Sequence, residues 1–183
     1  LIRLNASGVQ QWISRYNGAG NGDDFPRNML ITPAGDIYVV GESYNGSDKD
    51  GVIIKYSGSG AQQWAKKYDG LNGDDEFVGI QSGSDGLFYV GGHTTSIKGD
   101  LDALLVVYQP DGSLLHSGSF DAGSGGHDET KNLIITNDLI PVLATTSHAD
   151  TSALTLDGDI TAVAFQADAT PYWHATFDGT GND

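Results

Sequence analysis

The chain of 183 residues contains no cysteine, and this absence excludes disulfide bonds and cysteine-based metal sites. Basic residues are also few: nine lysines and arginines stand against 24 aspartates and glutamates, which gives a formal net charge of −15. A charge of this sign opposes binding to nucleic acid and to anionic membranes. No apolar run in the sequence approaches the roughly 20 residues that a membrane-spanning helix requires. We therefore expect neither nucleic acid nor a membrane span.

Helical periodicity is missing too, and short apolar runs are punctuated by 26 glycines. Runs rich in β-branched and aromatic residues, bounded by turn residues, predict β-strands. In the best-defined part of the chain these strands are expected at 26–32, 37–43, 51–57 and 61–68. The sequence therefore predicts an all-β fold.

An internal repeat organises these strands. Trp12, Trp64 and Trp173 lie in the similar contexts VQQWISRY, AQQWAKKY and TPYWHATF, and His116 takes the same place in LLHSGSF. The four anchor positions are 52, 52 and 57 residues apart. Four antiparallel strands in a unit of this length are typical of a propeller blade, so we expect a β-propeller with about three and a half blades in this chain.

The chain is predicted to be a single β-propeller region over residues 1–183, part of a larger propeller. Its units are one half blade followed by three complete blades, with approximate boundaries at 1–18, 19–70, 71–122, 123–179 and 180–183, the last being the start of the next link. A half blade leaves one strand edge unpaired, and such an edge pairs readily with another chain. We expect its missing strands to come from a neighbouring propeller segment or from a second copy.

The repeated columns resemble the bacterial β-propeller repeat family often called SBBP. The match is closest in Gly22-Asp23-Asp24 and at 35–43, 50–56 and 60–70, and it departs in the third unit at His116, Ala144 and 126–128. The resemblance implies a secreted or surface-displayed bacterial protein, so the expected location is extracellular or on the bacterial cell surface. It also implies that the propeller is an interaction or scaffold module, and it supplies no catalytic residues.

Acidic residues are distributed unevenly between the two ends of the predicted blades. In an up-and-down blade, the first and third connections open at one end, and the second connection and the link to the next blade open at the other. The acidic residues on the short first and third turns are Asp36, Asp85, Asp111, Asp138 and Asp168. All others lie in or beside the long loops and links, so this long-loop face is expected to be strongly negative and to bind a protein or glycan ligand.

The acidic links also suggest calcium, which takes six to eight oxygen ligands. The candidate ligands are Asp23, Asp24, Asp74, Asp75, Asp128 and Asp183. Their spacing matches neither an EF-hand loop nor a glycine-rich nonapeptide. The favoured interpretation is that Asp24 and Asp75 accept hydrogen bonds from backbone N–H groups where the chain enters the next blade. We expect no cofactor, with calcium as the alternative.

The three tryptophans share one strand position, which favours a wedge between adjacent sheets, with a locally bonded indole N–H, over a platform for sugars. Lys55, Lys66 and Lys67 are interpreted as solvated residues that protect strand edges.

Catalysis has little support in the sequence. The five histidines fall at different repeat positions without metal-binding spacing. His127-Asp128-Glu129 occupies the slot of Gly-Asp-Asp in the other units, so we interpret it as structural drift. We expect a non-enzymatic binding or scaffold module of an exported bacterial protein, acting in adhesion or protein interaction. The alternatives are a calcium-stabilised carbohydrate-binding propeller and an accessory part of a secreted hydrolase.

Overall fold

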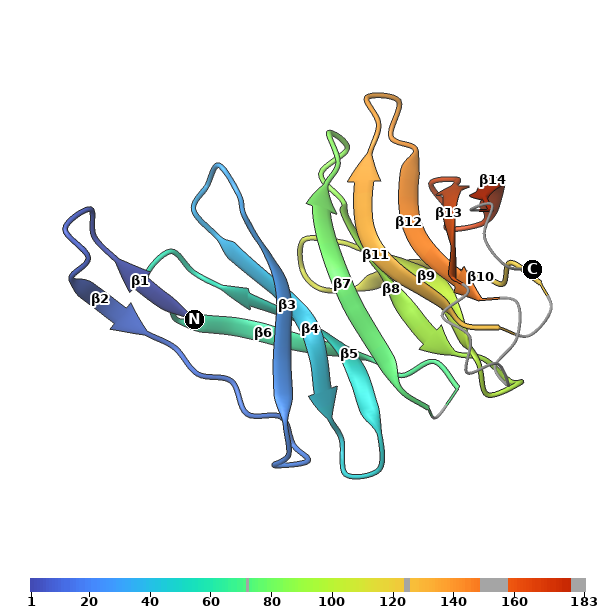
Figure 1. The fold of residues 1–183 in the computed structure, drawn as a ribbon. Helices are drawn as coiled ribbons and strands as arrows, with labels where there is room; N and C mark the ends of the chain where they lie inside the picture. Colours follow the sequence, from blue (N-terminus) through green and yellow to red (C-terminus); the bar gives the residue numbers. More distant parts are fainter. Residues whose placement is uncertain (72, 124–125, 149–157, 179–183) are drawn as a thin grey trace.

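The computed structural model describes residues 1–71, 73–123, 126–148 and 158–178, and within these ranges it is all-β, as predicted (Figure 1). Its strands form four antiparallel sheets, which we number in chain order. Sheet I contains β1 (Ile2–Leu4) and β2 (Gln10–Ile13). Sheet II contains β3 (Asp24–Ile31), β4 (Ile37–Tyr44), β5 (Lys49–Tyr56) and β6 (Gln62–Tyr68). Sheet III contains β7 (Asp75–Ser82), β8 (Phe88–Thr95), β9 (Leu101–Tyr108) and β10 (Leu114–Phe120). Sheet IV contains β11 (Asp128–Ile135), β12 (Pro141–His148), β13 (Gly158–Phe165) and β14 (Pro171–Phe177).

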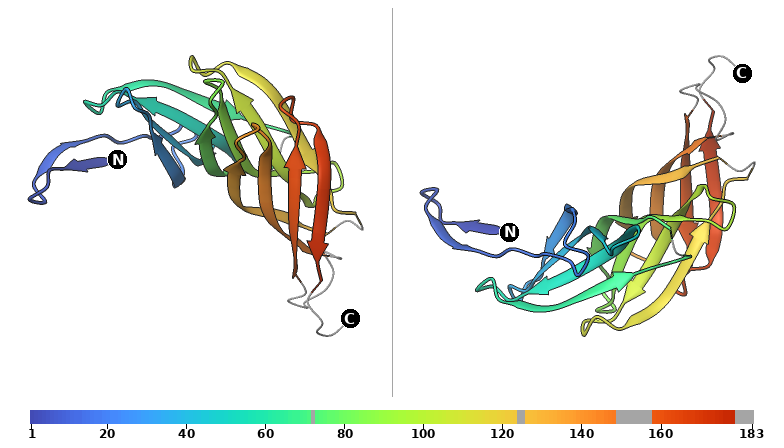
Figure 2. Two further views of the ribbon diagram at one scale, coloured as in Figure 1. Left: turned by 90° about the horizontal axis from the view of Figure 1, so that it is seen from above. Right: turned by 90° about the horizontal axis from the view of Figure 1, so that it is seen from below.

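Each strand of sheets II, III and IV pairs with the next one along the chain. This order puts the first and third turns of each sheet at one end, and the second turns and the links between sheets at the other. The second turns of sheets II and III, at 45–48 and 96–100, are no longer than the first and third turns, so the expectation of a longer second connection is wrong in these two sheets. The first strands β3, β7 and β11 contact one another in sequence. They lie on the concave side of an arc, with β6, β10 and β14 on its convex side (Figure 2).

Neighbouring sheets pack face to face, and the middle strands are buried on both faces. On β9, Leu104, Val106 and Tyr108 belong to the core between sheets II and III. The alternate residues Leu105 and Val107 belong to the core between sheets III and IV. Because successive side chains of a strand point to opposite faces, this double burial explains the uninterrupted apolar run ALLVVY.

Two of the three tryptophan anchors, Trp12 and Trp64, lie between sheets, as the wedge interpretation predicts, whereas Trp173 is 44% exposed. Trp64 packs against the core between sheets II and III, and its ring meets that of Tyr38 edge-on at 5.8 Å between centroids. Trp12 packs in the same way against sheet II. Its Nε1 is buried and has no hydrogen-bond partner among the described residues, so the expected local bond is wrong at this position. The apolar environment between the sheets provides no acceptor there.

A glycine of the following sheet lies against each wedge. A Cβ on Gly60 would be 2.7 Å from Cε3 of Trp12, and one on Gly112 would be 3.2 Å from Cδ2 of Trp64. The equivalent residue of sheet IV is Ala169, and the anchor before it is His116 rather than tryptophan. Where histidine replaces the tryptophan, alanine replaces the glycine that faces it. This joint replacement indicates that the sizes of the two side chains depend on each other.

The residue at this turn position also has a positive backbone φ angle, which glycine adopts most easily. Gly112 has φ 83°, and Ala169 adopts φ 64° although it carries a Cβ. We expect Ala169→Gly to raise the free energy of unfolding by up to about 1 kcal/mol, because glycine accepts this conformation without steric cost. Gly112→Ala is expected to lower it by about 2 kcal/mol, since strain and the contact with Trp64 add. Urea denaturation measures both changes.

Gly99 provides the matched control for Gly112, because it has φ 87° and its Cβ would meet nothing within 4 Å. Gly99→Ala isolates the backbone strain and should cost less than Gly112→Ala. Equal losses for the two variants would show that the indole contact contributes nothing.

Candidate functional site

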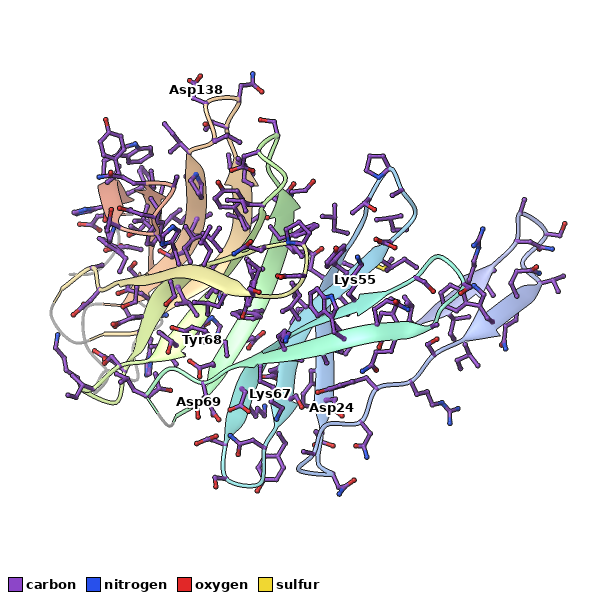
Figure 3. All side chains as sticks on the ribbon, turned by 180° about the vertical axis from the view of Figure 1, so that it is seen from behind. Asp24, Lys55, Lys67, Tyr68, Asp69 and Asp138 are labelled. Carbon is purple, nitrogen blue, oxygen red and sulfur yellow. The ribbon has the colours of Figure 1, made fainter. Side chains whose placement is uncertain are left out.

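The two ends of the sheets differ in the way the sequence predicts. Asp138 lies at the end of the first and third turns, whereas Asp24 and Asp69 lie at the opposite end, where the second turns and the links gather; we keep the name long-loop end for it (Figure 3). The aspartates singled out as calcium candidates belong to this second end, with the exception of Asp183, which lies outside the described residues.

One aspartate at the start of each first strand holds the link that precedes it. Oδ2 of Asp24, Asp75 and Asp128 accepts a hydrogen bond from a backbone N–H of the link. The donors are, in the same order, Gly18 at 3.0 Å, Gly70 at 2.8 Å and Ala122 at 2.8 Å. The predicted backbone bonding of Asp24 and Asp75 is thus confirmed, and Asp128 makes the same contact in the divergent unit.

The preceding residue in the link ties adjacent sheets together. Oδ1 of Asp74 accepts a hydrogen bond of 3.0 Å from the backbone N–H of Lys49, at the start of β5. In the next unit, Nδ1 of His127 accepts the equivalent bond from Leu101, also at 3.0 Å. This shared role supports the interpretation of His127 as drift, because its imidazole nitrogen replaces a carboxylate oxygen. Asp23, the third member of the column, is exposed.

Neighbouring aspartates in the sequence do not form paired ligands. Successive side chains of an extended segment point to opposite sides, and Asp74 is exposed whereas Asp75 is 1% exposed. Burial raises the pKa of Asp75 to about 6, although hydrogen bonds from Thr94 and from the Gly70 N–H act in the opposite direction.

Two lysines neutralise carboxylates instead of only protecting strand edges. Lys67 Nζ lies 3.0 Å from Oδ2 of Asp50, whose side chain is 5% exposed. Lys55 Nζ lies 2.8 Å from Oδ2 of Asp36 and over the ring of Tyr38. Lys67 is exposed, as expected, whereas Lys55 is half-buried, so the interpretation as a solvated residue is wrong for Lys55 only. Asp50 lies on the strand next to Lys67, and Asp36 lies in the turn just before β4, next to the strand of Lys55, so both contacts depend on the register.

Three carboxylates from different elements converge at the long-loop end. An oxygen from each of Asp102, Asp121 and Asp128 lies within 4.8 Å of the others, and within the described ranges no other set of three potential metal ligands gathers so closely. Only Asp128 is among the residues that the sequence indicated. The sequence did contain one sign of this cluster of carboxylates: Ser119 stands where the preceding unit has Lys67, so a positive charge is missing from this unit.

A charged cleft of about 700 Å³ crosses the first strands of sheets II, III and IV. Arg27 on β3 bridges two sheets, with Nε 2.6 Å from Oε1 of Glu76 on β7 and Nη2 3.2 Å from Oε1 of Glu42. Lys49 also reaches Glu42, at 3.2 Å. Both signs of charge therefore alternate along the concave side of the arc.

Two glutamates of this cleft, Glu76 and Glu129, have lowered pKa values. Burial opposes ionisation of Glu76, but the hydrogen bond and charge of His93 and the charge of Arg27 together lower its pKa. The hydrogen bond from Lys131 lowers the pKa of Glu129. A general acid needs a raised pKa, so these two residues are suited to ion pairing instead.

Comparison with models of known protein families and with curated proteins gave no match. Among the described residues, no helix is long and apolar enough to cross a membrane.

Proposed function

We propose that the chain is a segment of a β-propeller in which each sheet is one blade. The repeat of 52 residues, the up-and-down strand order and the contacts among β3, β7 and β11 support this arrangement. In a propeller the first strands line the central channel, and here they form the concave side of the arc.

We further propose that this segment is a non-enzymatic binding or scaffold module of an exported bacterial surface protein. The observation that carries the proposal is the cleft across three sheets, where Arg27, Lys49 and Lys131 stand beside Glu42, Glu76 and Glu129. A surface with both signs of charge complements a protein partner that also carries both, and such complementarity gives specificity and fast association. The bacterial surface location rests on the SBBP resemblance.

Two binding experiments test this function. The first measures binding of the chain to immobilised extracellular proteins, and the second measures its binding to a glycan array with and without a chelator. We expect a protein ligand whose affinity falls about tenfold in Lys49→Ala and in Lys131→Ala, because rim charges steer association. Lys66→Ala is the control, since Lys66 is exposed on β6 and does not line the cleft. An affinity unchanged by both cleft variants would contradict the proposed site. Binding to glycans alone, abolished by chelator, would support the carbohydrate alternative instead.

Sheet I presents an open edge and an apolar face. Among the described residues β1 pairs only with β2. On this sheet Ile2, Leu4 and Ile13 are about half exposed, at 56%, 55% and 46%, and Met29 of the neighbouring β3 is 56% exposed. Unpaired edges and apolar patches of this kind promote association.

Residues 1–183, studied alone, are therefore expected to self-associate, and light scattering measures this directly. Because β1 pairs with β2 on one edge and with no other strand among the described residues, its second edge is open to a partner strand. Leu4→Lys should shift the population toward monomer. A wild-type chain that is monomeric at all concentrations would show that the open edge is tolerated.

A further inference from the structure

Four aspartates gather where sheet III meets sheet IV. Asp102 lies at the start of β9, Asp121 follows β10 and Asp128 begins β11, and their carboxylate oxygens converge within 4.8 Å. Burial raises the pKa of both Asp102 and Asp128, and the nearby charge of Asp100 acts in the same direction. The nearest basic side chain is Lys98, which contacts Asp121 at 2.6 Å and is itself 57% exposed.

Several of these carboxylate oxygens lack a partner although they are buried. Asp100 and Asp128 are 2% and 1% exposed. Three oxygens have no hydrogen-bond partner among the described residues: Oδ2 of Asp100, Oδ1 of Asp102 and Oδ1 of Asp128. The Ser147 hydroxyl acts to lower the pKa of Asp128, but burial outweighs it and raises that pKa. A buried charged oxygen without a partner is costly, so native proteins rarely keep one without a ligand.

The preceding sheet interface carries the same four carboxylates. In the repeat, Asp48, Asp50, Asp69 and Asp75 occupy the positions of Asp100, Asp102, Asp121 and Asp128. There the protein supplies its own donors. Nζ of Lys67 lies 3.0 Å from Asp50, and the Asn45 amide donates to both Asp48 and Asp50.

Both donors are missing at the interface between sheets III and IV. Ser119 replaces the lysine, and Ser96 replaces the asparagine and reaches only Asp100. Of the four carboxylates between sheets II and III, only Asp75 keeps a buried oxygen (Oδ1) without a hydrogen-bond partner in the described part of the chain, whereas three carboxylates do so between sheets III and IV. The same acidic arrangement is thus largely neutralised by the chain at one interface and left with more uncompensated negative charge at the next. This contrast points to a cation from solution.

We propose that a calcium ion binds between Asp102, Asp121 and Asp128, at the place that the ammonium of Lys67 takes one interface earlier. All three residues offer oxygen, and no histidine belongs to the cluster, so the ligand set fits a hard cation rather than zinc. Ligands from two sheets and a link form an irregular set, which calcium accepts more readily than magnesium does.

The site is accessible from solvent. Asp102 and Asp121 line a pocket of about 360 Å³ together with the hydroxyl residues Ser96 and Ser119. Water bound in such a pocket completes the coordination of calcium in many sites. Lys98 makes only a surface ion pair with Asp121, a type of contact that contributes little to stability and yields to a divalent ion.

Calorimetric titration of the chain with CaCl₂, with thermal unfolding in CaCl₂ and in EDTA, tests the proposal. We expect one ion per chain, and a Tm about 5 °C higher in millimolar calcium, because the ion binds only the native state. NaCl at equal ionic strength should not produce this rise. An equal rise in NaCl, or neither heat nor Tm change with calcium, would overturn the proposal.

Exchanging the residue that distinguishes the two interfaces gives the sharpest variants. Ser119→Lys should abolish calcium binding, and Lys67→Ser should raise the stoichiometry to two. Asp121→Asn should lose the site, whereas Asp69→Asn, at the equivalent position of the other interface, should keep it. Calcium binding that persists in folded Ser119→Lys and in Asp121→Asn would show that the ion does not bind at this cluster.

Discussion

Trp64→Ala is expected to lower the free energy of unfolding by about 3 kcal/mol, the lower end of the range for truncating a large buried aromatic. The indole packs against Tyr38 and supports the core between sheets II and III, but it is only partly buried. Its removal leaves a cavity that the turn at Gly112 cannot fill, because glycine has no side chain to move inward. Chemical denaturation monitored by far-ultraviolet circular dichroism measures the loss.

Trp173 is the matched control, since it has the same repeat position but is 44% exposed. Trp173→Ala should cost less than about 1 kcal/mol, because an exposed side chain leaves no cavity behind. Similar losses for the two variants would mean that the wedge between sheets makes no contribution. If Trp64→Ala instead abolished ligand binding with little loss of stability, the tryptophans would be a binding platform.

Asp75→Asn is expected to stabilise the protein by about 2 kcal/mol at pH 7, since each pKa unit is worth about 1.4 kcal/mol. Burial raises the pKa of Asp75 to about 6, above its value near 3.8 in the unfolded chain. The folded state therefore binds more protons between these values. The favourable contribution of this carboxyl is complete below the unfolded pKa and is lost as the pH rises through 6. Asparagine keeps an oxygen for the Gly70 N–H without carrying the charge.

The difference in stability between wild type and Asp75→Asn, measured by urea denaturation from pH 4 to pH 8, isolates this carboxyl from all others. It should grow as the pH rises from 4 to 6 and level off above pH 6. Asp111 is the control, because hydrogen bonds from Ser113 lower the pKa of this exposed turn residue. Asp111→Asn should change stability in the opposite direction. A pH-independent difference for Asp75→Asn would contradict a raised pKa.

The strands could be predicted from the sequence because the alternation of apolar and polar residues and the residues typical of turns are local properties of the chain. The strands expected at 26–32 and 51–57 are found at Asp24–Ile31 and Lys49–Tyr56, two residues earlier at their starts. The small differences fall where Asp24 and Lys49 pair across the sheet with Ser43 and Tyr44. Such cross-strand pairing is not visible in a local pattern.

The acidic site was only partly predictable, for a geometric reason. Adjacent aspartates such as Asp74 and Asp75 suggested paired ligands, but neighbours on an extended chain diverge. The carboxylates that converge come from β9, from the link after β10 and from β11, and only the packing of sheet III on sheet IV brings them together. The replacement of Lys67 by Ser119 was visible in the repeat, but its meaning required the contact between Lys67 and Asp50.

The double burial of sheet III has a consequence for motion within the native state. Sheet III is covered on one side by the core shared with sheet II and on the other by the core shared with sheet IV. Opening it requires both cores to separate. In contrast, β14 is exposed along its whole length and is held, within the described residues, only by its pairing with β13 and a small contact with β10, where His174 meets the ring of Phe120. Fluctuations should therefore be graded along the arc, with the slowest amide exchange on β8 and β9. In a molecule built from stacked sheets, an outer strand can therefore unfold locally while the central sheet keeps its packing.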